Sequence, residues 1–210
     1  MNKTPTTLTN AEAEILLTFI QHNGIGLKAS LLNIRNYAIA TLMLDAGLRV
    51  GEVANLLQSD ITIAGLAVTA VCLTAQVTKN GTERTVPLSQ RCKKAIETLA
   101  GCVWIADKIS AHLFAFYESD SSKPISVRQI ERMIKFAGKM ALNRPIHPHI
   151  LRHTFATRMM RVTSIRIVQQ LLGHKSLQST QVYTHPNQDD LSNAIHQLDV
   201  QTDPKIVDKL

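Results

Sequence analysis

The sequence predicts an α+β fold that is mainly α-helical and carries one small antiparallel sheet of three strands. Apolar residues recur at helical spacing, often behind a helix-starting residue, over most of the 210 positions. Alternating β-branched residues are confined to the stretch 61–87. The length fits one domain, and 45% apolar residues with few aromatics is normal for a helical globular protein.

The amino-terminal part predicts three helices, at 10–22, 31–45 and 49–58. Thr9 and Glu12 form a capping-box pattern, in which the Thr9 hydroxyl accepts from an amide and Glu12 reaches back. The second helix can bury a face that includes Leu42 and Met43. Gly47 indicates its end, which places Arg49 just inside the third helix. A cation at a helix start opposes the helix dipole, so Arg49 needs another reason to be there.

The stretch 61–87 predicts the sheet. Asn80-Gly81 between two extended runs is a strong hairpin signal, and Ala64-Gly65 indicates a second turn. Lys79 then lies at the tip of the longer hairpin. The three extended runs are expected at 61–63, 66–77 and 84–86.

The rest of the chain is predicted to be helical apart from one buried extended piece at 112–116. Ser126 can cap a long helix whose Arg128, Arg132, Lys135 and Lys139 form a basic face. Pro148 suits the first turn of another helix. The expected helices are 90–99, 127–142, 149–160, 164–172, 177–183 and 190–198.

Composition restricts the partner and the compartment. Lys and Arg outnumber Asp and Glu by 23 to 16, and this excess favours a polyanion, although ribosome-associated and membrane-surface proteins share it. Cys72, Cys92 and Cys102 form no CxxC pair, so we expect reduced, partly buried thiols rather than a disulfide or metal site. The sequence shows neither a membrane-spanning run nor a signal-peptide core, and it predicts a cytosolic protein.

The stretch from His147 to His185 concentrates side chains that could act together on a phosphate. The phenolate of Tyr183 could attack phosphorus and keep the energy of the broken phosphodiester as a covalent ester. His149 and Arg152 share a helix face, where histidine can take a proton and arginine can bind phosphate through paired hydrogen bonds. His174 follows a helix-ending glycine and could donate to the phosphate.

Each of these residues also has an ordinary structural interpretation. Tyr183 could be a core residue, Arg152 a surface ion-pair residue and His174 a helix-capping residue. Lys79 could be simply exposed, or it could reach the minor groove and protonate a leaving oxygen. Arg49 could pair only locally with Glu52, one turn away, or clamp a phosphate while Glu52 holds it. The histidines near position 149 could be mistaken for a metal cluster, but no Asp, Glu or Cys joins them.

Five segments favour the functional interpretations as a set. AGLRVGEV, TKNGTERTVPL, HPHILRHTFAT, LLGHKS and TQVYTH occur in this order. In this order they resemble the catalytic motifs of the tyrosine recombinases, the family of phage-type integrases. The resemblance covers about Leu8 to Tyr183. It implies a tyrosine-recombinase catalytic domain at 1–186, followed at 187–210 by a helix and tail that could dock on a neighbouring subunit or fold back.

The resemblance also implies a role for each matching residue. Arg49 and Arg152 would bind the scissile phosphate, and Lys79 would protonate the departing 5′ oxygen. His149 would handle the tyrosine proton, His174 would complete the phosphate cradle, and Tyr183 would form a 3′-phosphotyrosine bond. Glu52 would support the site without reacting. The family needs no metal and no nucleotide cofactor.

The implied function is site-specific recombination of double-stranded DNA by a tetramer, with integration, excision, inversion or resolution as outcomes. A type IB topoisomerase and a DNA-binding accessory protein that has lost turnover are the alternatives. The sequence departs from the family because the motifs begin almost at once, without the usual amino-terminal clamp domain. Either the chain works alone, or it is a fragment, or an accessory DNA-binding protein supplies the clamp. The stretch 61–77 also looks longer than the usual first hairpin, which affects the reach of Lys79.

Overall fold

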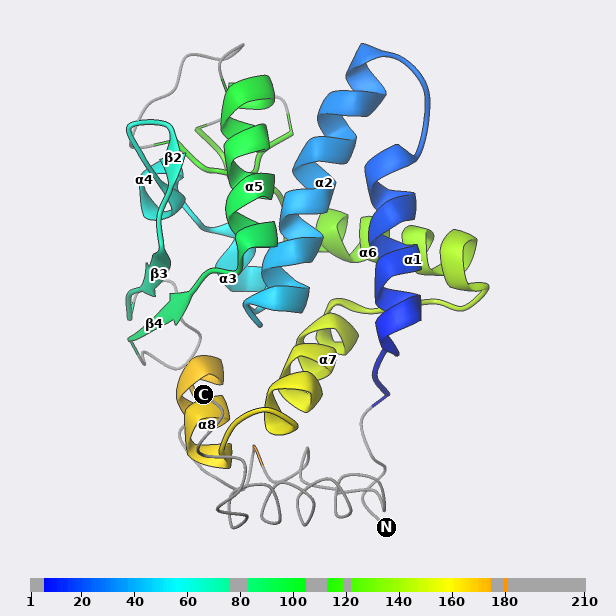
Figure 1. Cartoon of the computed structure of the whole chain (residues 1–210). Coiled ribbons are helices and arrows are strands. Elements are labelled where there is room, and N and C mark those ends of the chain that lie inside the picture. Colours follow the sequence, from blue (N-terminus) through cyan, green and yellow to red (C-terminus); the bar gives the residue numbers. More distant parts are fainter. Residues whose placement is uncertain (1–5, 76–82, 105–112, 119–121, 175–179, 181–210) are drawn as a thin grey trace, which may run out of the picture.

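The computed structural model describes residues 6–75, 83–104, 113–118, 122–174 and 180. Helices dominate these residues, and the strands lie along one side of them (Figure 1). The expected α+β, mainly helical class is confirmed. No helix in these segments is both long and apolar enough to cross a membrane. The helices are α1 (Asn10–His22), α2 (Leu27–Asp45), α3 (Val50–Ala54), α4 (Gln58–Ile61), α5 (Gln90–Leu99), the π-helix η1 (Ala100–Trp104), α6 (Val127–Leu142), α7 (Pro148–Met160) and α8 (Ile165–Leu172).

Helix α2 is the centre of the fold and packs against α1, α5, α6 and α7. Its residues from Ala38 to Leu44 are all buried, because α1 and α5 flank the helix and α6 lies behind it (Figure 1). The helix begins four residues before the expected start at Leu31. The carbonyl of Gly26 accepts from the amide and the hydroxyl of Ser30, so the first turn closes ahead of the apolar run.

The capping box of α1 is confirmed, since the Thr9 hydroxyl accepts from the Glu12 amide and the Glu12 carboxylate accepts from the Thr9 amide. The single helix expected at 49–58 is instead two short helices, α3 and α4. Between them the backbone pairs with a distant segment. The Leu56 carbonyl accepts from the Ala115 amide, and the Gln58 amide donates to the Leu113 carbonyl. These tertiary hydrogen bonds replace the helical ones that the local pattern predicts.

The strands form two antiparallel pairs rather than one three-stranded sheet. Strands β1 (Thr62–Ile63) and β2 (Leu66–Ala67) join through Ala64-Gly65, where both residues have positive φ as a type I′ hairpin turn requires. Strand β3 (Ala70–Leu73) pairs with β4 (Arg84–Pro87), with Val71 opposite Val86. The expected turn at Asn80-Gly81 lies outside the described residues.

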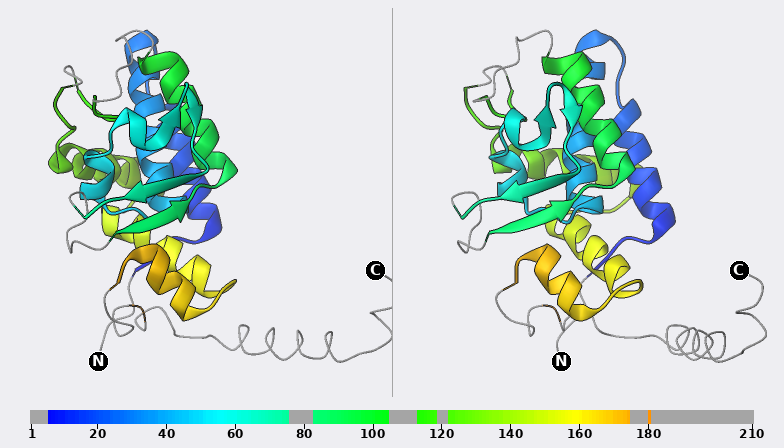
Figure 2. Two further views of the ribbon diagram at one scale, coloured as in Figure 1. Left: turned by 90° about the vertical axis from the view of Figure 1, so that its left-hand side faces the viewer. Right: turned by 60° about the vertical axis from the view of Figure 1, so that its left-hand side comes forward.

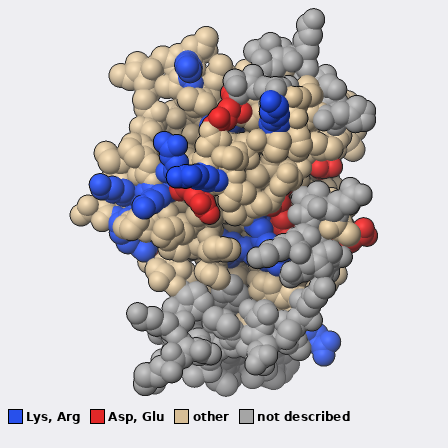
Figure 3. All heavy atoms as spheres, turned by 180° about the vertical axis from the view of Figure 1, so that it is seen from behind, with Lys and Arg blue, Asp and Glu red and all other residues tan. Residues whose placement is uncertain are grey.

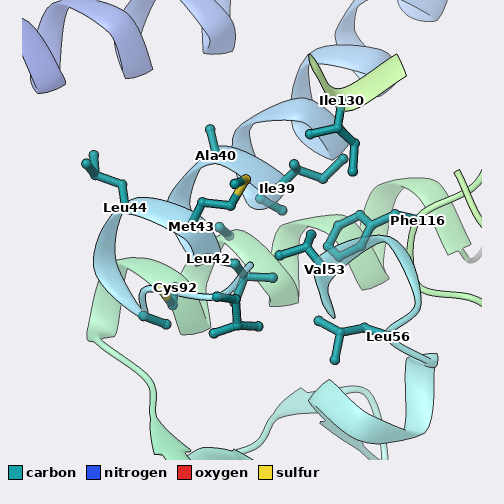
Figure 4. Packing of buried hydrophobic residues seen from close by; sticks show 14 of the residues in the cluster. Ile39, Ala40, Leu42, Met43, Leu44, Val53, Leu56, Cys92, Phe116 and Ile130 are labelled. Atoms are coloured by element: carbon teal, nitrogen blue, oxygen red, sulfur yellow. The ribbon is translucent and has the colours of Figure 1, made fainter. Parts of the chain in front are cut away.

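One hydrophobic core joins α1, α2, α5 and α6 to the strands. Figure 4 shows its centre, where side chains of α2 meet Val53, Leu56 and Phe116. All three cysteines are free, and burial raises the pKa of the Cys92 thiol to about 11. A smaller cluster joins α7 to α8 through Phe155, Val168 and Leu172. Helices α7 and α8 stay together at one end of the molecule in every ribbon view (Figure 2).

Candidate active site

The guanidinium of Arg49 lies where α3 begins. Arg49 is the N-cap of α3, with an extended backbone, rather than a residue inside the helix as expected. The carboxylate of Glu52 accepts from the Arg49 amide at 2.7 Å and from its Nη1 at 2.8 Å. Glu52 thus satisfies an amide at the helix start and compensates the unfavourable position of the cation. The side chain of Arg49 keeps 19% of its surface exposed, against 1% for Glu52.

Arg152 is buried on α7, where it donates to one carbonyl in a loop and to one carbonyl at the end of a helix. Its Nη1 donates to the Gly47 carbonyl, and its Nη2 donates to the Leu172 carbonyl at 2.6 Å. The same guanidinium lies 4.0 Å from the Glu52 carboxylate. The two arginines that the sequence predicts as phosphate ligands therefore flank one buried carboxylate.

A third guanidinium, from Arg84 on β4, also reaches Glu52, and sequence reasoning did not single it out. Its Nη1 and Nη2 donate to the two oxygens of Glu52 at 2.8 and 2.7 Å. Strand alternation is the signal that could have found it, because Arg84 shares the buried face of β4 with Val86. Burial alone would raise the pKa of Glu52, but the hydrogen bonds and charge of Arg84, with the hydrogen bonds of Arg49, hold it below its usual range.

The three arginines also bind the end of α8. Arg84 Nε donates to the carbonyl of Leu171 at 2.8 Å, and Arg49 Nη2 donates to that of Gly173 at 3.4 Å. With the bond from Arg152 to Leu172, three successive carbonyls accept from three different arginines. A helix C-terminus carries partial negative charge and carbonyls without partners within the helix. The arrangement therefore stabilises both the end of α8 and the arginines. These hydrogen bonds connect α3, β4 and α7 to the C-terminal end of α8, directly before His174.

His174 follows Gly173, whose φ of +61° ends α8 in the left-handed conformation. The His174 Nε2 lies 3.5 Å from Arg152 Nη2, and Nδ1 lies 2.9 Å from Thr180 Oγ1. A guanidinium only donates, so Nε2 accepts and the protonated Nδ1 donates to Thr180. Burial, with the charges of Arg152, Arg49 and Arg84, lowers the pKa of His174 to about 4. The ring is therefore neutral in the free site near pH 7.

His149 lies one turn before Arg152 on α7 and is exposed. Its ring stacks on that of His153, with centroids 6.2 Å apart. Burial lowers the pKa of His153, and the nearby charges of His149 and Arg152 act in the same direction. Lys79 and Tyr183 lie outside the described residues. Within the part of the chain that the structure describes, no group of three or more metal-ligating side chains could hold a metal ion.

The structure thus brings Arg49, Arg152, His174 and Glu52 together, with Arg84 added. Three guanidinium charges against one carboxylate leave an excess of two positive charges, in a site whose histidine is neutral. Such a site is built to receive an anion, and planar guanidinium groups suit the oxygens of a phosphate.

The phage integrase family model matches residues 6–190. The chain belongs to the phage integrase family. The sequence is 34% identical over 166 residues to the tyrosine recombinase XerC of Pediococcus pentosaceus, covering 77% of this chain and 53% of that protein. Against XerC of Shewanella sp. (strain ANA-3) the identity is 36% over 155 residues, covering 73% and 49%. The predicted resemblance to tyrosine recombinases is confirmed.

Solved structures of this family share the fold. The XerA recombinase superposes with a TM-score of 0.73 at 30% identity, covering 94% of this chain and 66% of that one. The XerH recombinase bound to its difH substrate superposes with a TM-score of 0.71 at 24% identity, covering 92% and 54%. This phage integrase family chain spans about half the length of the curated relatives it matches.

Proposed function

We propose that this chain is the catalytic part of a site-specific DNA recombinase that cleaves and rejoins strands through a 3′-phosphotyrosine. The observation that carries the proposal is the convergence of Arg49, Arg152 and His174 around the buried carboxylate of Glu52. The excess positive charge suits the phosphodiester that such an enzyme must bind. The XerC relatives carry the name tyrosine recombinase, and the solved XerH complex contains a DNA substrate.

The position of Thr180 supports Tyr183 as the nucleophile. Thr180 is buried and its Oγ1 lies 2.9 Å from His174 Nδ1, so this one residue lies beside the arginine cluster. Three further residues can carry the Cα of Tyr183 at most about 11 Å from that of Thr180. The phenol oxygen of Tyr183 would attack phosphorus while the bond to the 5′ oxygen breaks. His149 would take the phenol proton, and Lys79 would give a proton to the departing oxygen.

The arginines would supply the main catalytic effect. Negative charge grows on the nonbridging oxygens as Tyr183 attacks, and Arg49 and Arg152 would neutralise it in a site that excludes most water. His174 can donate to such an oxygen only with a proton on Nε2. Its Nε2 is an acceptor in the free site, so phosphate binding would have to change its tautomer or bring in a proton.

Helix α6 offers a second contact to DNA. Its residues Arg128, Arg132, Lys135 and Lys139 are all exposed and recur at helical spacing, as the sequence predicts. Figure 3 shows Lys and Arg side chains gathered on one side of the rear face, and α6 lies towards that face, behind α1 and α2, in Figure 1. Helix α6 packs against α3, which begins after Arg49, and against α7, which carries Arg152. A basic face so placed could bind the duplex beside the scissile phosphate.

The domain division and the assembly are part of the same proposal. Residues 1–186 would form the catalytic domain, and the segment 187–210 would dock on a neighbouring subunit of a tetramer on double-stranded DNA. A DNA substrate fits the cytosolic location that the sequence predicts. An accessory protein could supply the clamp on the opposite face of the duplex. Deletion after His185 should abolish strand exchange and leave weak binding to a single site.

The test is covalent trapping on a nicked duplex whose sequence is first selected by binding to this protein. We expect a protein–DNA adduct that mass spectrometry assigns to Tyr183. Tyr183→Phe should form none, whereas Tyr37→Phe, a matched change on α2, should form it at the normal rate. An adduct on Tyr183→Phe would refute the assignment. Binding without any adduct would indicate an accessory protein, and relaxation of any supercoiled plasmid would indicate a topoisomerase.

A further inference from the structure

Arg84 is a buried cation that the reaction outlined above does not use. Only 3% of its side chain is exposed, and it begins β4, opposite Leu73 of β3. Removing a charge from water is costly unless partners compensate it fully. A buried arginine at the edge of a candidate active site therefore needs a reason that local structure does not give.

All three guanidinium nitrogens of Arg84 have partners. Two hold the carboxylate of Glu52 in a fork, and Nε donates to the carbonyl of Leu171. The end of α8 fits closely around the side chain, since a Cβ on Gly173 would lie 3.0 Å from Arg84 Cδ. Arg84 therefore connects β4 to both α3 and α8, and each of its three guanidinium nitrogens is already bound within the protein.

Glu52 passes this restraint on to Arg49. The oxygen that accepts from Arg84 Nη1 also accepts from Arg49 Nη1, and the other oxygen accepts from the Arg49 amide. Arg49 has the more exposed side chain of the two, at 19% against 3%. The buried arginine thus holds the carboxylate that aims the accessible one.

We propose that Arg84 is a positioning residue for strand transfer, which orients Arg49 through Glu52 and holds the end of α8 that presents His174. The inference rests on the proposed function, because the positioned groups are those assigned to the phosphate. Arg84 itself does not touch the substrate. Its removal should slow cleavage and leave DNA affinity nearly unchanged.

Arg84→Lys is the direct test, because lysine keeps the charge but cannot reproduce the fork and the Nε bond together. Single-turnover cleavage of a nicked duplex should slow by about 10–100-fold, the usual cost of a small misplacement of reacting groups. The dissociation constant for the same duplex should change less than about two-fold. Arg91→Lys is the matched control, because Arg91 forms a similar fork with Asp45 instead of Glu52, and it should cleave at the normal rate.

A double-mutant cycle with Arg49→Lys distinguishes positioning of Arg49 by Arg84 from a purely structural role of Arg84. If Arg84 acts through Arg49, the second substitution should add little to the loss caused by the first. Full additivity, or cleavage by Arg84→Lys at the normal rate, would overturn the proposal. If Arg84→Lys does not fold, the pair Arg84→Met with Glu52→Gln removes both buried charges together. That pair should bind the duplex normally and cleave it slowly, and normal cleavage by it would also overturn the proposal.

One measurement separates this proposal from the proposed function. The guanidinium protons of Arg49 can be followed by NMR without DNA, and in Arg84→Lys they should exchange faster with water because Glu52 is no longer held. Unchanged exchange would overturn the positioning role even if the wild-type protein cleaves DNA. Faster exchange in a protein that never forms an adduct would leave the positioning intact and refute the proposed function instead.

Discussion

The carboxylate of Glu52 on α3 lies in the guanidinium fork of Arg84 on β4, with nitrogen–oxygen distances of 2.8 and 2.7 Å. Neither side chain has appreciable contact with water. The same carboxylate binds Arg49 and lies 4.0 Å from Arg152. The cations that would meet the phosphate are therefore held in place before any substrate arrives, which is the condition for electrostatic preorganisation.

Glu52→Gln should destabilise the protein strongly. Breaking a buried, hydrogen-bonded ion pair from one side costs about 3–5 kcal/mol, because the remaining charges lose their partner. The pKa of Glu52 is lowered, so its contribution is complete above the ordinary value of 4.5 and is lost as the pH falls through the folded-state pKa. The free energy of unfolding, measured with urea between about pH 3 and 7, should therefore fall more steeply towards acid pH in the wild type than in the variant.

Glu14→Gln is the control for that experiment. Glu14 also pairs with an arginine, Arg91, but 60% of its side chain is exposed. An exposed ion pair contributes about 0–1 kcal/mol, so this variant should stay close to the wild type. Equal losses for Glu14 and Glu52 would contradict the special role of the buried carboxylate.

His174 should remain neutral in the DNA-free protein. Its pKa is lowered to about 4, so its NMR signals should not titrate between about pH 5.5 and 7.5, where an ordinary histidine does. Because the folded pKa is lowered, the stability it contributes is present above the ordinary value and is lost as the pH falls towards 4. Bound DNA should move the titration upwards, since a phosphate anion favours the charged ring. A normal titration without DNA would contradict the described burial.

Gly138→Ala should destabilise α6 where it meets the chain before α7. A Cβ at this position would lie 2.7 Å from Cβ and 2.8 Å from the backbone nitrogen of Ile146. Overpacking of this kind costs about 1–3 kcal/mol. Gly51→Ala on α3 meets no atom within 4 Å and should be neutral or slightly stabilising, by up to about 1 kcal/mol. Thermal unfolding measures the stability of both variants. A Gly138→Ala variant as stable as the wild type would contradict the close contact.

The basic face of α6 should contribute to DNA affinity through charge. Lys135→Gln and Lys139→Gln should each lower the slope of log affinity against log salt by about 0.9, the value for one phosphate contact. Lys94→Gln, an exposed lysine of α5, should leave the slope unchanged. Fluorescence titration at several salt concentrations measures these slopes. Identical slopes for all three variants would exclude α6 from the DNA interface.

Local signals predicted two capped helix starts correctly. Thr9 with Glu12, and Ser126 with Gln129, satisfy amides within one turn, so sequence alone places these two boundaries correctly. The split between α3 and α4 could not be predicted in this way, because the bonds of Leu56 and Gln58 go to residues 113–115. Pairing across more than 50 residues leaves no trace in a local pattern.

The candidate site follows the same rule. Arg49, Arg152 and His174 stand in motifs, and the structure brings them together. Arg84 stands in a quoted motif too, yet its importance depends on burial and on the position of Glu52, which only the folded chain reveals. Thr180 was likewise missed, since its hydroxyl matters only through the ring of His174.

Arg49 is the residue on which the proposed chemistry depends most, because it would neutralise charge on the scissile phosphate. The direct measurement compares Arg49→Ala with the wild type on two nicked duplexes, one with an ordinary phosphate and one with a neutral methylphosphonate at the cleavage position. On the ordinary phosphate the variant should cleave about 10²–10³-fold more slowly, the usual effect of removing one charge-stabilising donor. On the methylphosphonate the difference should nearly vanish, because less charge needs stabilising. An equal loss on both duplexes would contradict the claim.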